Sequence, residues 1–206
     1  PETAQIRAVL LYQGVNMFSH AITRKPGKSM VNGLSSANHG KPDYGLALQH
    51  HEAYVDALTA CGLDVTVLPA DEEFPDSTFV EDTALLTKKC AIVTRPGAPS
   101  RRGEVAAIKE VLKGFYTVIK EIQSPGTVEA GDIMMVGDDF YIGLSDRTNE
   151  HGADQVITIL GDFGYRGHAV PVGEVLHYKS GIAYVENQTI VVVEGFVDLS
   201  PFTGFN

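Results

Sequence analysis

The sequence contains no tryptophan, only two cysteines, and fewer basic than acidic residues. Cys61 and Cys90 form neither a disulfide framework nor a metal-ligand spacing, so we expect both thiols in the core. Lysine and arginine number 16 against 26 aspartate and glutamate residues, which gives a formal net charge of −10. Nucleic acids and anionic membranes attract basic surfaces, so this balance argues against both as partners. A cationic small molecule suits the charge better.

Long apolar runs are also absent. A membrane-spanning helix needs a run of about 18 apolar residues, and none is present. The apolar stretch 8–12 is too short and too poorly flanked for a signal peptide. We therefore expect a cytoplasmic protein. With 44% hydrophobic residues in a chain of 206, a compact fold with a real core is expected.

Three carboxylates lie close together in a segment that otherwise has the composition of a buried strand. Asp76, Glu81 and Asp82 interrupt β-prone residues that predict a strand continuing to Leu86. An unpaired charge in the interior costs several kcal/mol, so each carboxylate needs a cationic or hydrogen-bonding partner. Two interpretations are open. A ligand supplies that partner, or Asp76 caps a turn while the other two pair with lysine or arginine of this chain.

Polar residues recur along the chain with a period of 48, at Glu81, Glu129 and His177. Each is followed by two short β runs joined by a polar turn. These runs are 84–87 with 91–94, 133–136 with 140–143, and 181–185 with 189–193. A polar residue at a fixed phase of a repeat predicts modules that present these side chains to one common centre.

The rest of the chain adds helices and strands between these hairpins. Apolar spacing and flanking glycines predict strands over 18–24 and 63–68 and helices over 44–61, about 103–113 and about 150–160. The loop 30–43 is rich in glycine and serine, and its length suits a lid.

Residues 1–16 differ from the rest of the chain. Met17 resembles a natural start, so we interpret 1–16 as an N-terminal extension, either artificial or an extended start, before a domain over 17–206. Within the extension, 6–13 is a candidate strand that folds back on 18–24.

Several of these residues suit a free amino acid with a guanidinium side chain. Glu81 and Asp82 match the fork of a guanidinium, and Asp76 suits an ammonium group. Arg101 and Arg147, each just after a predicted hairpin, suit a carboxylate. The other interpretation of the two arginines is that they lie on the surface and pair with local acids.

Glu129 and His177 are candidates for an acid and base pair. A carboxylate beside an imidazole orients the ring and raises its pKa. A lone histidine is more often structural, but His177 lies at the repeat phase of two glutamates, which favours a functional interpretation.

Together, the motifs of this sequence resemble those of a known family. The stretches 74–77, 79–82, 94–98, 100–102, 129–132, 145–149 and 176–177 closely resemble dimethylarginine dimethylaminohydrolase of the bacterial type, over about 17–206. The resemblance implies α/β structure in the fivefold pseudo-symmetric propeller, or pentein, of the amidinotransferase superfamily. It further implies hydrolysis of asymmetric dimethylarginine and monomethylarginine to citrulline and a methylamine. The implied partner is this small molecule, without a metal or cofactor, and a homodimer is left open.

The resemblance implies roles for individual residues. They are Glu81 and Asp82 for the guanidinium, Asp76 and the Leu34 backbone for the α-ammonium, Arg101 and Arg147 for the α-carboxylate, and Glu129 and His177 for catalysis. In the family a cysteine thiolate attacks the guanidinium carbon.

The sequence departs from the family at this nucleophile. The family's cysteine lies in a C-terminal strand, and neither Cys61 nor Cys90 occupies that place. We therefore expect the propeller to be incomplete in this chain, its final module or modules missing, and the 206 residues alone to be inactive. An arginine deiminase-like hydrolase and a non-catalytic arginine-binding relative are the alternatives. A purely structural protein would not explain why polar residues recur with a period of 48 residues.

Overall fold

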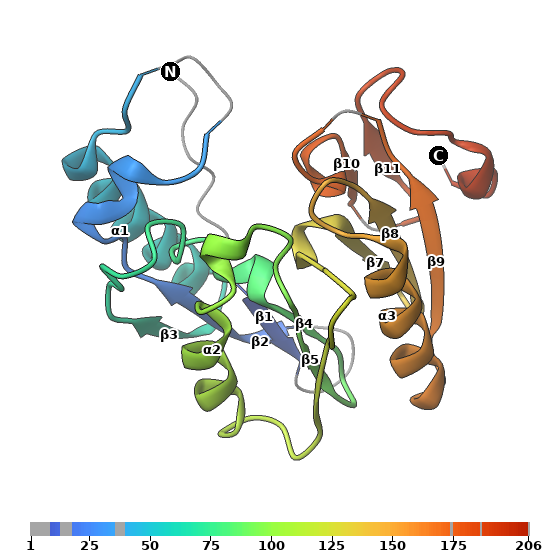
Figure 1. The fold of residues 1–206 in the computed structure, drawn as a ribbon, viewed down its shortest axis with the longest axis horizontal. Coiled ribbons are helices and arrows are strands. Elements are labelled where there is room, and N and C mark those ends of the chain that lie inside the picture. The colour runs from blue at the N-terminus through green and yellow to red at the C-terminus, as the bar shows by residue number, and fades with distance from the viewer. Residues whose placement is uncertain (1–8, 13–17, 36–39, 174, 186, 206) are drawn as a thin grey trace.

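The structure, a computed structural model, describes residues 9–12, 18–35, 40–173, 175–185 and 187–205. It is a mixed α/β fold in which small sheets follow one another along the chain, from blue to red in Figure 1. The first sheet has the order β1-β2-β3, formed by Val9–Tyr12, Phe18–Arg24 and Asp64–Leu68, with helix α1 at Tyr44–Ala60. The predicted strands and helix of this part are confirmed within a few residues.

Two complete copies of one module follow, each built from a 3₁₀ turn, an antiparallel hairpin, a helix and a parallel strand. The first copy consists of η2 (Val80–Thr83), β4 (Ala84–Leu86), β5 (Ala91–Val93), α2 (Val105–Leu112) and β6 (Ile119–Glu121). The second consists of η4 (Ala130–Asp132), β7 (Ile133–Val136), β8 (Asp139–Leu144), α3 (Glu150–Asp162) and β9 (Arg166–Pro171). The third strand of each sheet pairs parallel to the second strand of its hairpin. The predicted hairpins and repeat are thereby confirmed.

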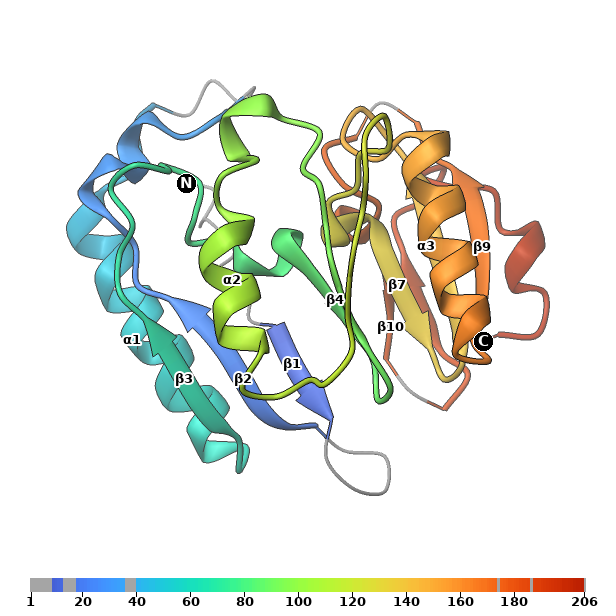
Figure 2. The same cartoon turned by 60° about the horizontal axis from the view of Figure 1, so that its bottom comes forward.

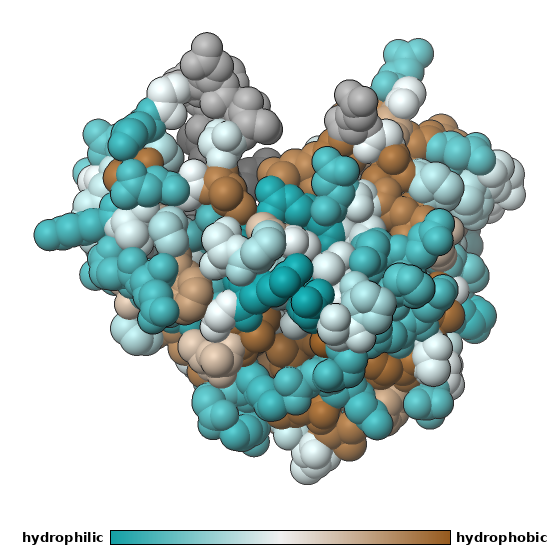
Figure 3. Space-filling view, viewed as in Figure 1, coloured by the Kyte–Doolittle hydropathy of each residue, from teal (hydrophilic) through white to brown (hydrophobic). Residues whose placement is uncertain are grey.

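A third copy begins with η5 (Tyr178–Ser180) and the hairpin of β10 (Ile182–Tyr184) and β11 (Ile190–Val192). Its turn contains Asn187 and Gln188, both with positive φ, as tight hairpin turns require. Among residues 187–205, which the structure describes, only the 3₁₀ turn Ser200–Phe202 is helical. Figure 3 shows apolar residues gathered over this hairpin, where Val185, Val191 and Val193 are more than half exposed.

The core lies between the helices and the sheets. Helix α3 lies against the sheet β7-β8-β9 in both Figure 1 and Figure 2. Its buried residues Val156 and Leu160 are four apart, so they share one face of the helix. Asn149 caps its N-terminus by accepting a hydrogen bond from Gly152 N, and the same oxygen accepts from Thr127 N. The cap therefore also holds the loop before η4.

The predicted strand around Asp76, Glu81 and Asp82 is wrong. Ser77 N, Phe79 N and Asp82 N bond to carbonyls three residues earlier, which makes a series of turns ending in η2. Because these local bonds satisfy the backbone, no sheet partner is needed until Ala84. β propensity depends on context, so the composition alone misled the prediction.

The prediction that both cysteines lie in the core is half wrong. Cys90 is buried in the turn between β4 and β5, but Cys61 is exposed. Cys61 is the residue after α1 and precedes Gly62, whose φ of +86° ends the helix at the surface.

The predicted fold-back of the N-terminal stretch is confirmed over Val9–Tyr12. This strand pairs antiparallel with β2, with Val9 opposite Ile22. The other residues of the predicted strand lie outside the described residues, as do 36–39 of the predicted lid. Within the described part of the chain, no helix is both long enough and apolar enough to cross a membrane.

Candidate active site

One pocket of about 260 Å³ collects side chains from every module. It is lined by Leu34, Asp76, Phe79, Glu81, Asp82, Arg101, Glu129, Arg147, Leu176, His177 and Ser180. All eight residues with a predicted role are among them. Phe79, Leu176 and Ser180 were not selected from the sequence, because nothing in their type distinguishes them from structural residues.

The 3₁₀ turns explain why the 48-residue phase leads to one pocket. Glu129 and His177 directly precede η4 and η5 and have extended backbones, and Glu81 lies within η2. Each of the three residues therefore lies at the point where the loop of its module leads into the hairpin. Equivalent turns in successive modules place these side chains toward the same centre.

Two aspartates join successive turns. Asp82 Oδ1 accepts a hydrogen bond from Gly131 N at 3.1 Å, and Asp132 Oδ1 accepts from Tyr178 N at 2.8 Å. The first N–H groups of a helical turn have no partner within the turn, and they favour a negative charge. At Gly131 a Cβ would lie 2.6 Å from Asp82 Oδ1 and 3.0 Å from His177 Cγ, so only glycine fits.

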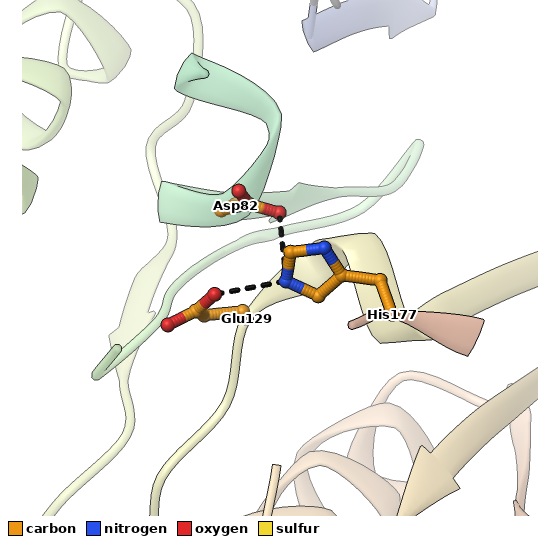
Figure 4. Close-up of side chains that lie close together, drawn as sticks. All are labelled: Asp82, Glu129 and His177. Carbon is orange, nitrogen blue, oxygen red and sulfur yellow. Dashed lines mark hydrogen bonds and ion pairs between the residues drawn. The ribbon is translucent and has the colours of Figure 1, made fainter. Parts of the chain in front are cut away.

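His177 and Glu129, two of the residues that line the pocket, form a hydrogen-bonded pair (Figure 4). Nε2 of His177 lies 2.9 Å from Glu129 Oε2 and 3.8 Å from Asp82 Oδ1. Burial alone lowers the pKa of His177, but the hydrogen bond to Glu129 and the charges of Asp82 and Asp132 raise it above 6.5. Burial alone raises the pKa of Glu129, but His177 and the two nearby arginines lower it. The pair is thereby stabilised as an imidazolium and a carboxylate.

We expect the imidazole of His177 to titrate above its ordinary pKa of 6.5. The Glu129→Gln variant removes the charge and is expected to lower this pKa, because burial then dominates. The ion pair adds stability that is present below pH 6.5 and is lost as the pH rises through the folded-state pKa. NMR titration of the histidine Cε1–H signals, assigned with His177→Asn, measures the shift. His168, exposed beside Asp139, serves as an internal control. An unchanged pKa in Glu129→Gln would contradict the assignment of the pair.

Arg101 is almost entirely buried, with 4% of its surface exposed. Its Nη1 lies 2.7 Å from Asp82 Oδ2 and 3.5 Å from Glu129 Oε2. Nε and Nη2 both bond to the carboxylate of Glu104. Burial lowers the pKa of Arg101, but Asp82 and Glu104 outweigh this effect and raise the pKa above its ordinary value, so the guanidinium stays protonated. Arg101 thus fixes the positions of two pocket carboxylates.

Glu104 was missed by the sequence analysis. Its carboxylate is 2% exposed and lies behind Arg101, outside the pocket lining. Burial raises the pKa of Glu104 to about 7, against the hydrogen bonds and charge of Arg101. The spacing of three residues from Arg101, in a stretch that the structure makes helical, was the available signal.

The other predicted ligands are arranged around this centre. Arg147 is partly exposed, and its Nη1 lies 3.5 Å from Glu129 Oε1. Glu81 forms an ion pair with Lys179 at 2.5 Å. The interpretation that Glu81 and Asp82 pair with basic residues of this chain is therefore confirmed, and both carboxylates still line the pocket.

Leu34 and Asp76 lie together at the pocket wall. The backbone N–H of Leu34 donates to both carboxylate oxygens of Asp76, at 3.0 and 3.2 Å. Burial raises the pKa of Asp76, while this hydrogen bond and the charges of Arg101 and Arg147 lower it. A ligand ammonium at Asp76 would therefore also contact the segment that carries Leu34.

The charges in the pocket favour an organic cation over a metal ion as the ligand. Asp82, Glu129 and His177 each offer a ligand atom within 4.8 Å of the others. The Arg101 guanidinium contacts two of these groups, and its charge repels a metal ion there. Four carboxylates against two guanidinium groups leave the lining formally negative. Neither Cys61 nor Cys90 lines the pocket.

Comparison with known proteins identifies the family of this chain. The model of the family described as "N,N dimethylarginine dimethylhydrolase, eukaryotic" matches residues 36–198. The N(G),N(G)-dimethylarginine dimethylaminohydrolase of Pseudomonas aeruginosa is 53% identical over 92% of this chain and 75% of its own length. That of Streptomyces coelicolor is 37% identical, over 83% of this chain and 67% of its own.

The fold agrees with these sequence similarities. A mutant of the Pseudomonas aeruginosa enzyme, solved in complex with citrulline, matches with a TM-score of 0.90, over 92% of this chain and 75% of the other. The family match spans most of the chain, and the pocket residues lie within it or just before it. The chain belongs to the dimethylarginine dimethylaminohydrolase family.

Proposed function

We propose that this protein takes part in the hydrolysis of N-ω-methylated arginines, asymmetric dimethylarginine and monomethylarginine, to citrulline and a methylamine. The observation that carries the proposal is that all eight predicted ligands and catalytic residues line one pocket. Relatives at 53% and 37% identity bear the name of this activity, and a similar solved structure was obtained with citrulline.

Each part of the substrate has a chemically suited partner. The guanidinium faces Glu81 and Asp82, whose carboxylates match its charge and fork geometry. The α-ammonium is assigned to Asp76 beside Leu34, and the α-carboxylate to Arg147 and Arg101. Asp82 and Arg101 already bond to each other, so a bound substrate joins an existing network.

The reaction uses His177 and Glu129 for proton transfer. A cysteine thiolate forms a bond to the guanidinium carbon, the C–N bond to the methylated nitrogen breaks, and the imidazolium of His177 protonates the departing amine. The neutral imidazole then takes one proton from water, whose oxygen attacks the same carbon, and collapse of the adduct releases citrulline, the thiolate and the second water proton, which the free amine takes up. Glu129 stabilises the imidazolium in the first step. Neither thiol of this sequence lies in position to attack.

We also infer the finer fold and the location of the protein. The repeated modules support the fivefold α/β propeller, with the domain over 17–206. The acidic composition supports a cytoplasmic protein without a nucleic acid or membrane partner.

Titration calorimetry of the 206-residue chain tests the proposal. We expect saturable one-to-one binding of dimethylarginine and of citrulline, and none of lysine, which lacks the planar group. If the chain binds neither dimethylarginine nor citrulline, the proposed function is wrong.

A second candidate is a non-catalytic arginine-binding protein, favoured by the positions of the thiols. Cys61 is exposed and Cys90 is buried in a hairpin. A citrulline assay on the same chain tests whether these residues turn the substrate over by themselves. We expect binding without product. Product above that of the His177→Ala control would show that these residues suffice for turnover.

A further inference from the structure

Asp132 is fully buried, does not line the pocket, and is linked by hydrogen bonds, directly or through one hydroxyl group, to the backbone of three functional segments. We propose that Asp132 is a positioning residue that holds the Arg147 loop and the His177 turn against Glu129. The proposal rests on the proposed function for its effect on ligand binding. Its geometric part, the claim that Asp132 holds the two segments in place, is argued from hydrogen bonds alone.

The first link leads to Arg147. The hydroxyl of Ser145 donates to Asp132 Oδ2 at 2.7 Å, and Ser145 Oγ accepts from the backbone N–H of Arg147 at 3.0 Å and of Thr148 at 3.2 Å. A hydroxyl has one hydrogen and two lone pairs. Ser145 uses all three, so the loop keeps this shape only while Asp132 Oδ2 accepts a hydrogen bond.

The second link leads to Glu129. The hydroxyl of Thr148 also donates to Asp132 Oδ2, at 2.6 Å, and its oxygen accepts from Glu129 N at 3.1 Å. One carboxylate oxygen thus receives two hydroxyl groups. These hydroxyls in turn hold the backbone of the carboxylate-binding arginine and of the catalytic glutamate.

The third link leads to His177. Asp132 Oδ1 accepts from the backbone N–H of Tyr178, the residue that follows His177. Burial raises the pKa of Asp132, and the hydrogen bonds of Thr148, Ser145 and Tyr178, with the charge of His177, oppose this effect. All three links need an acceptor, so the arrangement requires the carboxylate form of Asp132.

The Asp132→Asn variant separates the links. An asparagine keeps an oxygen for Tyr178 N, but its NH₂ group cannot accept from the two hydroxyls, and the Ser145 oxygen has no lone pair left to accept from it. We expect the Arg147 loop to loosen while the His177 turn stays in place. Ser145→Ala removes the acceptor of the Arg147 and Thr148 N–H groups but leaves the hydrogen bonds of Asp132 to Thr148 and Tyr178, and it is the second variant should Asp132→Asn fail to fold.

Amide hydrogen exchange tests the geometric part without any ligand. We expect the Arg147 N–H to exchange at least about tenfold faster in both variants, since the lost hydrogen bond lowers the opening free energy. The N–H of Leu46, capped by Asp43 at 2.9 Å in α1, is an internal reference that should not change. Unchanged Arg147 exchange in Ser145→Ala would overturn the proposal.

Ligand binding tests the functional part. We compare citrulline with N-carbamoylputrescine, the same ureido amine without the α-carboxylate. Asp132→Asn is expected to weaken citrulline about 10- to 100-fold and Ser145→Ala about 3- to 10-fold, by loosening a charged contact. The ligand without the carboxylate should change less than about threefold in either variant, because it makes no ion pair with Arg147.

A matched control is available at the surface. Ser200 Oγ donates to Asp198 Oδ2 at 2.6 Å in an exposed turn, so Ser200→Ala removes a similar bond and should change neither ligand. Equal weakening of both ligands would mean a general structural role for Asp132 and would overturn the proposal. If the unsubstituted chain binds neither ligand, the proposed function fails, whereas the exchange result still decides the geometric part.

Discussion

Replacement of Arg101 by methionine is expected to lower the free energy of unfolding by about 3–5 kcal/mol, the cost of leaving buried carboxylates without their cation. The Arg101 side chain is 5% exposed and contacts Asp82, Glu104 and Glu129, which are 9%, 2% and 0% exposed. Methionine has a similar length but no charge. Three carboxylates would then share a site of low dielectric without their common partner.

The loss should be largest at neutral pH. Some of the three carboxylates must take up protons in the variant to avoid a buried charge, so its folded state binds more protons than that of the parent. The difference in stability between parent and variant should therefore shrink as the pH falls toward 4.5, the ordinary pKa of Glu104. Urea unfolding followed by circular dichroism at several pH values measures both quantities.

Arg166→Met is the matched control for this substitution. Arg166 also makes two hydrogen bonds to one carboxylate, that of Asp139, but its side chain is 63% exposed. Solvent screens such a pair, so we expect a far smaller change in the unfolding midpoint. An equal effect of the two substitutions would show that the buried network around Arg101 does not stabilise the fold.

The second large effect is expected on ligand choice. The Glu81→Gln variant should bind dimethylarginine about 10- to 100-fold more weakly, as expected for loss of a partly buried hydrogen bond between charged groups. Citrulline should lose less than about threefold, because its ureido group is neutral and glutamine still offers an oxygen. In the variant, the positive charge of Lys179 beside position 81 is no longer neutralised by the Glu81 carboxylate. It therefore repels the guanidinium and weakens dimethylarginine binding further.

The control for Glu81→Gln is another lysine–glutamate pair. Glu110 bonds to Lys113 at 2.6 Å on the surface of α2, and Glu110→Gln should change neither affinity. Calorimetric titration of the parent and both variants with the two ligands gives the ratio of dissociation constants. If Glu81→Gln weakens both ligands equally, the carboxylate does not recognise the guanidinium.

The sequence alone determined most elements of this fold and eight of the residues that line its pocket. Apolar spacing located α1, α2 and α3, and the polar turns located three hairpins, because both patterns act over a few residues. The recurrence of Glu81, Glu129 and His177 predicted a common centre. Repeated modules place equivalent positions in equivalent surroundings, so the phase carried three-dimensional information.

Only the tertiary structure decided how these residues are held. The backbone around Glu81 and Asp82 follows 3₁₀ geometry instead of a strand, since local hydrogen bonds there replace those of a sheet.

The partners of the charged groups were also set by the tertiary structure. No local pattern marks Lys179 as the partner of Glu81, or Asp132 as the link between the Arg147 loop and the His177 turn. Lys179 lies 98 residues from its partner, and the link from Asp132 to Tyr178 spans 46. The pairing of buried charges depends on which groups the packed modules bring within hydrogen-bonding distance, and that is a property of the folded chain.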